Sequence, residues 1–284
     1  MLSLHTNSAA LSAQNSISRT QSSLSTSQTR LSTGYRINSA MDDAAGLQIA
    51  SRLKAQTSGM TVAMRNTQNS TSMLQTAEGA LDEVSNMLIR MKDLATQAAD
   101  ASSTTADQTA MQSEYDALGK ELSNVLKNTT FGGAKLLVGG TIASEMKFQI
   151  GASSSETMSV NMSTAMSTLN TDVSGVSSNY TTAAAGSEVN ATNANATIGK
   201  LEKALASVNT VRSDLGASAN RLEHVYNNLA NISTNTKAAT GQIMDVDFAS
   251  ESANMTSNQM LLQASTAMLK QANSQASMVM SLLQ

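Results

Sequence analysis

Residues 73–95, MLQTAEGALDEVSNMLIRMKDLA, carry the pattern that decides the fold. Apolar side chains recur there every seven residues in two interleaved ladders. The ladders are Met73, Ala80, Met87 and Leu94, and Leu74, Leu81, Leu88 and Ala95. A seven-residue apolar repeat is typical of helices that pack along a seam. The stretch therefore predicts a long helix with one face buried against other helices.

Three further ladders of the same period lie outside this stretch. They comprise Ile17, Leu24 and Leu31, preceded by Leu4 and Leu11; Leu201, Val208, Leu215, Leu222 and Leu229; and Phe248, Met255, Leu262, Leu269, Ala276 and Leu283. The 284 residues contain no Pro, a residue that interrupts helix interiors. Together these features predict a mainly α fold, an elongated helical bundle or coiled coil built from both chain ends.

A small β region is expected in the middle of the chain. Residues 147–151 and 157–161 alternate polar and apolar side chains, which predicts two short strands joined as a hairpin. Residues 162–197 are rich in Ser, Thr, Asn and Ala and carry few charges, a composition typical of a surface segment or a loosely ordered loop. We therefore expect residues 162–197 at the surface, outside the helical core.

The two chain ends carry unusually few charges. Residues 1–40 contain no acidic side chain, and in residues 252–284 the only charged side chain is Lys270. Burying five large apolar side chains yields about 10 kcal/mol, whereas ordering roughly thirty residues costs about 1 kcal/mol or more for each of them. Each end alone is therefore expected to be disordered, either as a plain flexible tail or as a segment that folds on assembly.

The regular ladders favour folding on assembly. In that interpretation the two ends pack together and against neighbouring copies of the chain. The predicted assembly core consists of Leu4, Leu11, Ile17, Leu24, Leu31, Met255, Leu262, Leu269 and Leu283.

The composition argues against catalysis and against several kinds of binding. A formal net charge of −3 gives no general attraction to nucleic acid, and no apolar run approaches a membrane span in length. The chain has no Cys, and its two histidines, His5 and His224, lie far apart in sequence. No nucleophile elbow or phosphate-binding glycine loop is present. We expect no catalytic residue, no metal site and no cofactor, and hence no enzyme.

Residues 31–50, LSTGYRINSAMDDAAGLQIA, closely resemble the N-terminal signature of bacterial flagellin, the subunit of the flagellar filament. Residues 75–81, QTAEGAL, and 131–137, FGGAKLL, resemble two further motifs of that family in the expected order. Residues 245–251, DVDFASE, resemble a motif near the end of the family's chains. The resemblance covers most of the sequence apart from its middle.

The resemblance implies an organisation in shells. Residues 1–40 and 248–284 would be inner-core helices ordered by assembly, packed as the inner tube of the filament. Residues 41–161 and 198–247 would form a helical outer-shell domain, with the β-hairpin in its first part. Residues 162–197 would be a short variable surface segment, in which the Ser and Thr of residues 162–182 either carry glycans, as in some flagellins, or belong to a plain solvated loop.

The resemblance also implies partners and a location. A flagellin polymerises with itself into a helical homopolymer, and a flagellar export chaperone, the filament cap and hook–filament junction proteins act on it. The implied location is the extracellular flagellar filament. The N-terminus shows no pattern of a signal peptide, which is consistent with export by the flagellar type III route without cleavage. No nucleic acid or membrane partner is expected.

One surface patch has a more specific implication. Residues 89–96 resemble the flagellin surface recognised by the vertebrate Toll-like flagellin receptor, with Arg90, Leu94 and Glu114 at the matching positions. In the family this patch also lies in a contact between subunits. The plain alternative is a helix in which Leu94 belongs to the seam and the charges are solvated, and the two readings are compatible.

Asp42 and Asp43 could suggest a metal pair. We interpret them instead as a helix start, because carboxylates stabilise the positive end of the helix dipole. Gly34 and Gly46 bracket this position and suit a bend in the chain.

The expected function is that of a structural subunit that self-assembles into the flagellar filament for motility. Two alternatives stay open at this point: a hook–filament junction protein of the same architecture, and a secreted coiled-coil adhesin whose ends are free tails.

Overall fold

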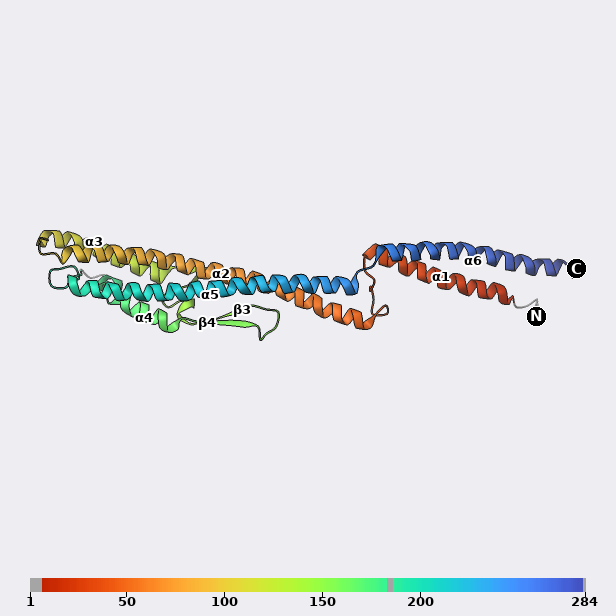
Figure 1. Cartoon of the computed structure of the whole chain (residues 1–284), viewed down its shortest axis with the longest axis horizontal. Helices are drawn as coiled ribbons and strands as arrows, with labels where there is room; N and C mark the ends of the chain where they lie inside the picture. The colour runs from red at the N-terminus through yellow and green to blue at the C-terminus, as the bar shows by residue number, and fades with distance from the viewer. Residues whose placement is uncertain (1–6, 183–185, 283–284) are drawn as a thin grey trace. The chain divides into compact units, whose positions relative to one another are not determined.

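The computed structural model describes residues 7–182 and 186–282, and of residues 276, 277 and 279–282 the backbone only. The elements in chain order are α1 (Ser8–Thr33), α2 (Ala44–Ala98), α3 (Thr105–Asn128), β1 (Thr130–Phe131), β2 (Ala134–Lys135), the 3₁₀ turn η1 (Thr141–Ala143), β3 (Glu145–Gln149), β4 (Thr157–Asn161), α4 (Ser163–Ser174), the 3₁₀ turn η2 (Ser178–Tyr180), α5 (Ala194–Met244) and α6 (Phe248–Leu282). The fold is mainly helical with two small antiparallel hairpins, which confirms the predicted fold class (Figure 1).

The chain forms two compact units. Unit 1 consists of Met1–Thr57 and Thr234–Gln284, and unit 2 of Ser58–Ser233. Unit 1 therefore takes in more than the predicted inner-core segments, because the first turns of α2 and the last turns of α5 belong to it.

Unit 2 is built on the long helices of the predicted seams. Within it α2 and α5 lie side by side (Figure 1), and ion pairs join them at Lys92–Glu202 and Arg212–Asp82, each with an N–O distance of 2.9 Å. The core contains one complete ladder from each helix, namely Leu74, Leu81, Leu88 and Ala95 on α2, and Leu201, Val208, Leu215, Leu222 and Leu229 on α5. Both ladders are buried, which confirms that the seven-residue repeat marks the packed face.

The predicted β-hairpin is present. β3 and β4 pair antiparallel, with Met146 opposite Val160 and Phe148 opposite Met158. The first strand begins and ends two residues earlier than predicted, because Ile150 and Gly151 belong to the turn, where the Ile150 N–H donates to the Glu156 carbonyl at 3.0 Å. The apolar side chains of the alternating pattern face the core of unit 2.

A second, smaller hairpin follows α3, which ends at Asn128. β1 and β2 are joined through Gly132 and Gly133, whose φ angles are 58° and 86°. Both angles lie in the left-handed region that the favoured two-residue hairpin turns require and that side chains with a Cβ avoid.

The segment 162–197 is not the loosely ordered surface segment that its composition suggested. It contains α4, whose Met166, Leu169 and Val173 are buried in the core of unit 2, followed by the buried Tyr180 and Val189. The three α4 positions have the i, i+3, i+7 spacing of one helix face. The polar residues that dominate the composition occupy the opposite, exposed face, so an average over the segment hides the stripe.

Polar contacts fasten the chain after α4 to helix α3. Lys127 donates from Nζ to the Tyr180 carbonyl at 2.8 Å and lies 4.6 Å from the centre of the Tyr180 ring. Glu188 accepts from the Ser178 N–H at 2.7 Å and from Gln112 Nε2 at 3.0 Å. Burial raises the pKa of the Glu188 carboxyl, but the hydrogen bonds from Ser178 and Gln112 outweigh it and hold the pKa below its ordinary value.

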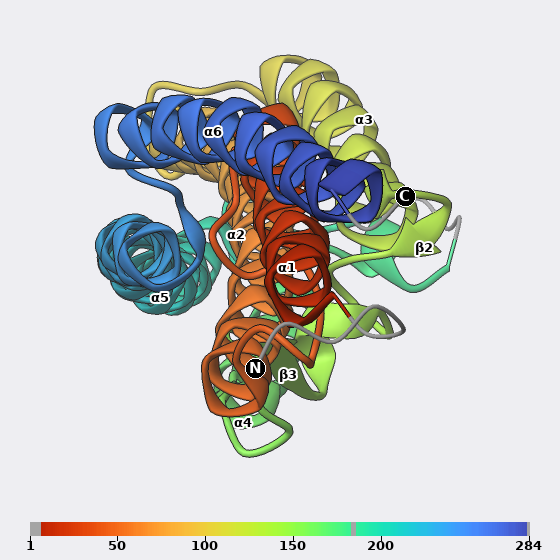
Figure 2. The same cartoon turned by 90° about the vertical axis from the view of Figure 1, so that its right-hand side faces the viewer.

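Unit 1 is dominated by α1 and α6, which lie side by side (Figures 1 and 2). Helix α1 begins at the N-cap Asn7, whose side chain accepts from the Ala10 N–H at 3.0 Å. It ends at Gly34, which has a φ of 76° and donates its N–H to the Arg30 carbonyl at 2.9 Å. A left-handed glycine of this kind is a common helix terminator.

Candidate functional site

The α1–α6 pair runs antiparallel and is fixed near both ends of α1. Asn7 donates from Nδ2 to the Ala272 carbonyl at 3.1 Å, and Arg30 lies 3.6 Å from the Glu251 carboxylate. Counting along the two antiparallel helices from these contacts gives their register. It places Leu11 at the level of Leu269, Ile17 at that of Leu262, Leu24 at that of Met255 and Leu31 at that of Phe248.

Most of the predicted assembly core therefore lies along this helix pair. Ile17, Leu24, Leu31, Met255, Leu262 and Leu269 are half-buried, and Leu11 remains 56% exposed. Leu4 and the side chain of Leu283 lie outside the described residues. The prediction that the two chain ends pack together is confirmed. Their packing against neighbouring copies stays a prediction.

Helix α6 carries a second apolar stripe that the ladder did not reveal. Met260, Leu261 and Met268 are 59%, 55% and 66% exposed. At about 100° per residue they fall within an arc of about 100°, and this arc lies on the other side of α6 from Met255 and Leu262. The missed signal was present in the sequence as apolar residues flanking the ladder positions. Helix α6 thus has one apolar face towards α1 and one that is open.

Backbone hydrogen bonds join the segment that follows α1 to the segment that precedes α6. The Arg36 N–H donates to the Met244 carbonyl at 2.6 Å, and the Val246 N–H donates to the Gly34 carbonyl at 3.0 Å. Arg36 also donates from a guanidinium nitrogen to the Ile243 carbonyl at 2.9 Å. The segment after α1 and the segment before α6 are therefore joined as a short backbone bridge.

Asp43 caps the start of α2 as the sequence predicted, whereas Asp42 caps the turn that precedes the helix. Asp43 accepts from the Gly46 N–H at 2.8 Å in the first turn of α2. Asp42 accepts from the N–H groups of Ser39 and Asn38, and these hydrogen bonds hold its pKa below the ordinary value. Gly46 lies inside α2 rather than in a bend, and a Cβ there would come within 2.7 Å of the buried Ile37.

The structure separates the three residues of the predicted receptor patch. Arg90 and Glu114 meet at the surface of unit 2, with an N–O distance of 2.7 Å and both side chains about half exposed. Leu94 is only 2% exposed and packs in the core of unit 2. The charged pair is accessible in the single chain, whereas Leu94 belongs to the seam.

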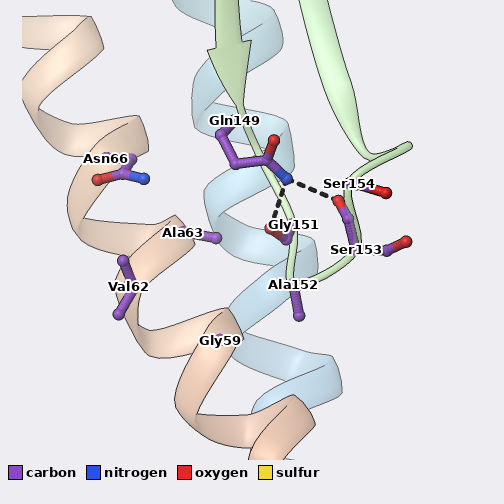
Figure 3. A pocket seen from close by; sticks show the side chains of 9 residues that line it. All are labelled: Gly59, Val62, Ala63, Asn66, Gln149, Gly151, Ala152, Ser153 and Ser154. Atoms are coloured by element: carbon purple, nitrogen blue, oxygen red, sulfur yellow. Dashed lines mark hydrogen bonds between the residues drawn. The ribbon is translucent and has the colours of Figure 1, made fainter.

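A hollow of about 360 Å³ lies between α2 and the turn of the β3–β4 hairpin (Figure 3). Gln149 holds this turn by donating to the carbonyls of Gly151 and Ser153 at 2.9 and 2.7 Å. A Cβ on Gly59 would approach the Ala152 Cβ to 2.6 Å, so Gly59 allows the turn to lie close to α2. The side chains that line this hollow are apolar or uncharged polar ones.

Across residues 7–182 and 186–282, no three His, Asp or Glu side chains gather as metal ligands. None of the helices in that part of the chain is long and apolar enough to cross a membrane.

The long packed helices and the open apolar stripe of α6 define a helical structural subunit. Models of the bacterial flagellin N-terminal and C-terminal helical regions match residues 4–141 and 198–283. A flagellin of Halalkalibacterium halodurans is 40% identical over 251 residues, covering 88% of each chain. A flagellin of Bacillus subtilis is 36% identical over 305 aligned positions, covering 99% of each chain. This chain belongs to the bacterial flagellin family and is a structural subunit of the extracellular flagellar filament.

A solved structure from Vibrio parahaemolyticus, described as that of a flagellar hook-associated protein, has a TM-score of 0.56. It covers 72% of this chain and all of its own, at 17% identity. At that identity the similarity concerns the fold alone. The junction-protein and adhesin alternatives are not better supported than flagellin.

Proposed function

We propose that α1 and α6 form the assembly surface of this subunit, and that they pack with neighbouring copies as the inner tube of the filament. The observation that carries the proposal is the open stripe on α6, Met260, Leu261 and Met268, which α1 leaves exposed. Covering these side chains would release about 3–5 kcal/mol per subunit.

The charge distribution supports the same surface. In α6 the charged side chains are Glu251, which lies 3.6 Å from Arg30, and Lys270. Close packing of many identical helices therefore brings few like charges together. Polar but uncharged residues cover the rest of the helix, and they can be hydrogen-bonded between copies at little desolvation cost.

Seeded extension of filaments tests the proposal. The full chain should extend flagellar seeds, and a chain that stops after Ser252 should not, because it lacks α6. The truncated chain should keep the buried ladders of unit 2 and hence its helical circular dichroism. Normal polymerisation of the truncated chain would contradict the assembly role of the C-terminal helix.

A charge on the open stripe gives a sharper version of this test. Leu261→Asp places a carboxylate inside the stripe, whereas Gln259→Asp places one on α6 about 150° from the stripe centre. Leu261→Asp should slow seed extension by tenfold or more, at about 1.4 kcal/mol for each factor of ten. Gln259→Asp should have a clearly smaller effect, and equal loss in both variants would argue against the stripe.

The domain division and the remaining partners belong to the proposal as well. We infer inner-core segments at 1–40 and 248–284 and an outer shell formed by 41–161 and 198–247, with 162–197 as the variable part. An export chaperone, the filament cap and junction proteins are the expected partners, and the type III apparatus the expected export route. A non-enzymatic role is expected too, and stoichiometric zinc in the purified protein would count against it.

The Arg90–Glu114 pair is proposed as a contact for the Toll-like flagellin receptor and for the neighbouring subunit. Arg90→Ala should reduce receptor signalling by monomers, and Arg212→Ala is the matched control because Arg212 forms a similar surface pair with Asp82 outside residues 89–96. Leu94 is a poor test residue, because its truncation would leave a core cavity. Unchanged signalling by the Arg90→Ala monomer would rule out the receptor contact.

A further inference from the structure

Sulfur is unusually accessible on the open stripe of α6. The chain has 18 Met and no Cys, so thioethers are its only sulfur groups. Met260 and Met268, at 59% and 66% exposure, flank Leu261 on the stripe. Methionines of unit 2 such as Met91 and Met166 are fully buried. Because oxidation of methionine follows exposure, an oxidant reaches the stripe before it reaches the core.

We propose that Met260 and Met268 are oxidation sites that switch off assembly of the free subunit. The proposal rests on the assembly role of α6 proposed above. The oxidant is a peroxide, represented by hydrogen peroxide. The thioether sulfur attacks one peroxide oxygen, the O–O bond breaks, and an S–O bond forms while water leaves. The sulfur loses two electrons, and the peroxide gains them.

The sulfoxide opposes association only at the step in which a neighbouring copy covers the stripe. A sulfoxide oxygen is a strong hydrogen-bond acceptor that water satisfies in the free subunit. Packing against a neighbouring copy removes that water, and burying an unsatisfied polar group opposes association. A subunit already in the filament has its stripe covered, so its sulfur atoms are shielded from the peroxide. The switch therefore acts on subunits before they are incorporated.

Seeded extension with peroxide-treated full-length subunits tests the switch. Three chains are compared before and after treatment with hydrogen peroxide: the wild type, the double variant Met260→Leu/Met268→Leu, and Met41→Leu. Leu conserves the volume and apolar character of Met. Met41 is 96% exposed and lies outside α6, so Met41→Leu controls for oxidation at an accessible methionine elsewhere. Peptide mass mapping measures the sulfoxide at each position.

The treated wild type and treated Met41→Leu should extend seeds about tenfold more slowly than the untreated chains. The treated double variant should be slowed clearly less than the treated wild type, although Met278, which is 57% exposed on α6, stays oxidisable in it. Methionine sulfoxide reductases should restore extension by the treated wild type, a readout that does not depend on any variant folding. Peroxide applied to preformed filaments should yield several-fold less sulfoxide at Met260 and Met268 than in free subunits.

Two results would overturn the switch. One is an undiminished extension rate in wild type that mapping shows to be fully oxidised at both positions. The other is equal slowing of the double variant and the wild type by peroxide. Failure of the assembly role itself is recognised without oxidant, by extension from the chain that stops after Ser252. The two failures are therefore distinguishable.

Discussion

The ladders of α5 and α6 have the same seven-residue period but different surroundings. Leu222 on α5 is completely buried within the core of unit 2, to which α2, α3 and α4 also contribute side chains. Leu262 on α6 is half-buried, with α1 as its packing partner. The period of a ladder indicates that a helix has a seam. Whether one chain can cover that seam depends on how many other elements surround it.

The largest expected effect comes from truncating a ladder leucine on α5 and comparing it with the same truncation on α6. Leu222→Ala should lower the free energy of unfolding of unit 2 by about 2–5 kcal/mol, because it leaves a cavity in a closed core. Urea unfolding followed by tyrosine fluorescence measures this, since Tyr115, Tyr180 and Tyr226 lie in unit 2 and only Tyr35 in unit 1.

The matched variant is Leu262→Ala. It should change the same unfolding curve by less than about 0.5 kcal/mol, as expected for a site outside the closed core, and should instead slow seeded extension. If both variants destabilised unit 2 equally, the distinction between a completed and an open seam would be wrong.

The next largest expected effect is a difference in sign between two glycine-to-alanine substitutions, one in each unit. Gly34→Ala should loosen the end of α1 by about 1–2 kcal/mol, because a Cβ is unfavourable in the left-handed conformation. Gly79→Ala, inside α2 where a Cβ meets no atom within 4 Å, should stabilise unit 2 by about 0.5–1 kcal/mol. Amide hydrogen exchange, resolved by peptide, should accelerate in α1 for the first variant and slow in α2 for the second. If amide exchange accelerated in both variants, or slowed in both, the backbone conformation of the two glycines would not explain the changes.

The smallest expected effect is the pH dependence of the stability that Glu188 gives to unit 2. Since the folded-state pKa of Glu188 is lowered, its stabilisation is present above the unfolded pKa of about 4.3 and is lost as pH falls through the folded value. Glu188→Gln should cost about 1 kcal/mol at pH 7, and the difference from wild type should shrink between about pH 5 and 3. Urea unfolding across this range measures it. Glu83→Gln, at an exposed site on α2, is the control and should show no such convergence.

The sequence was sufficient to predict the features that depend on short-range pattern. The seams of α2 and α5, the β3–β4 hairpin and the carboxylate start of α2 all follow from spacing or residue type. The α4 stripe of Met166, Leu169 and Val173 does not show in the average composition of residues 162–197, because polar residues on the opposite helix face outnumber it. The burial of Leu94 follows from its place in a ladder. The apolar residues of the α6 stripe are visible in the sequence, but their exposure depends on how many neighbours surround that helix and does not follow from spacing.

The backbone bridge between the two connecting segments has a consequence for the order of folding. Arg36 and the Ile243 carbonyl that it binds are separated by 207 positions in the chain. Closing an unstructured loop of that length costs about 5 kcal/mol of chain entropy. Once the intervening residues have folded, most of that entropy has already been lost. Loop entropy therefore favours an order in which unit 2 forms first and α1 and α6 pair afterwards, so that a subunit arriving unfolded gains its paired surface last.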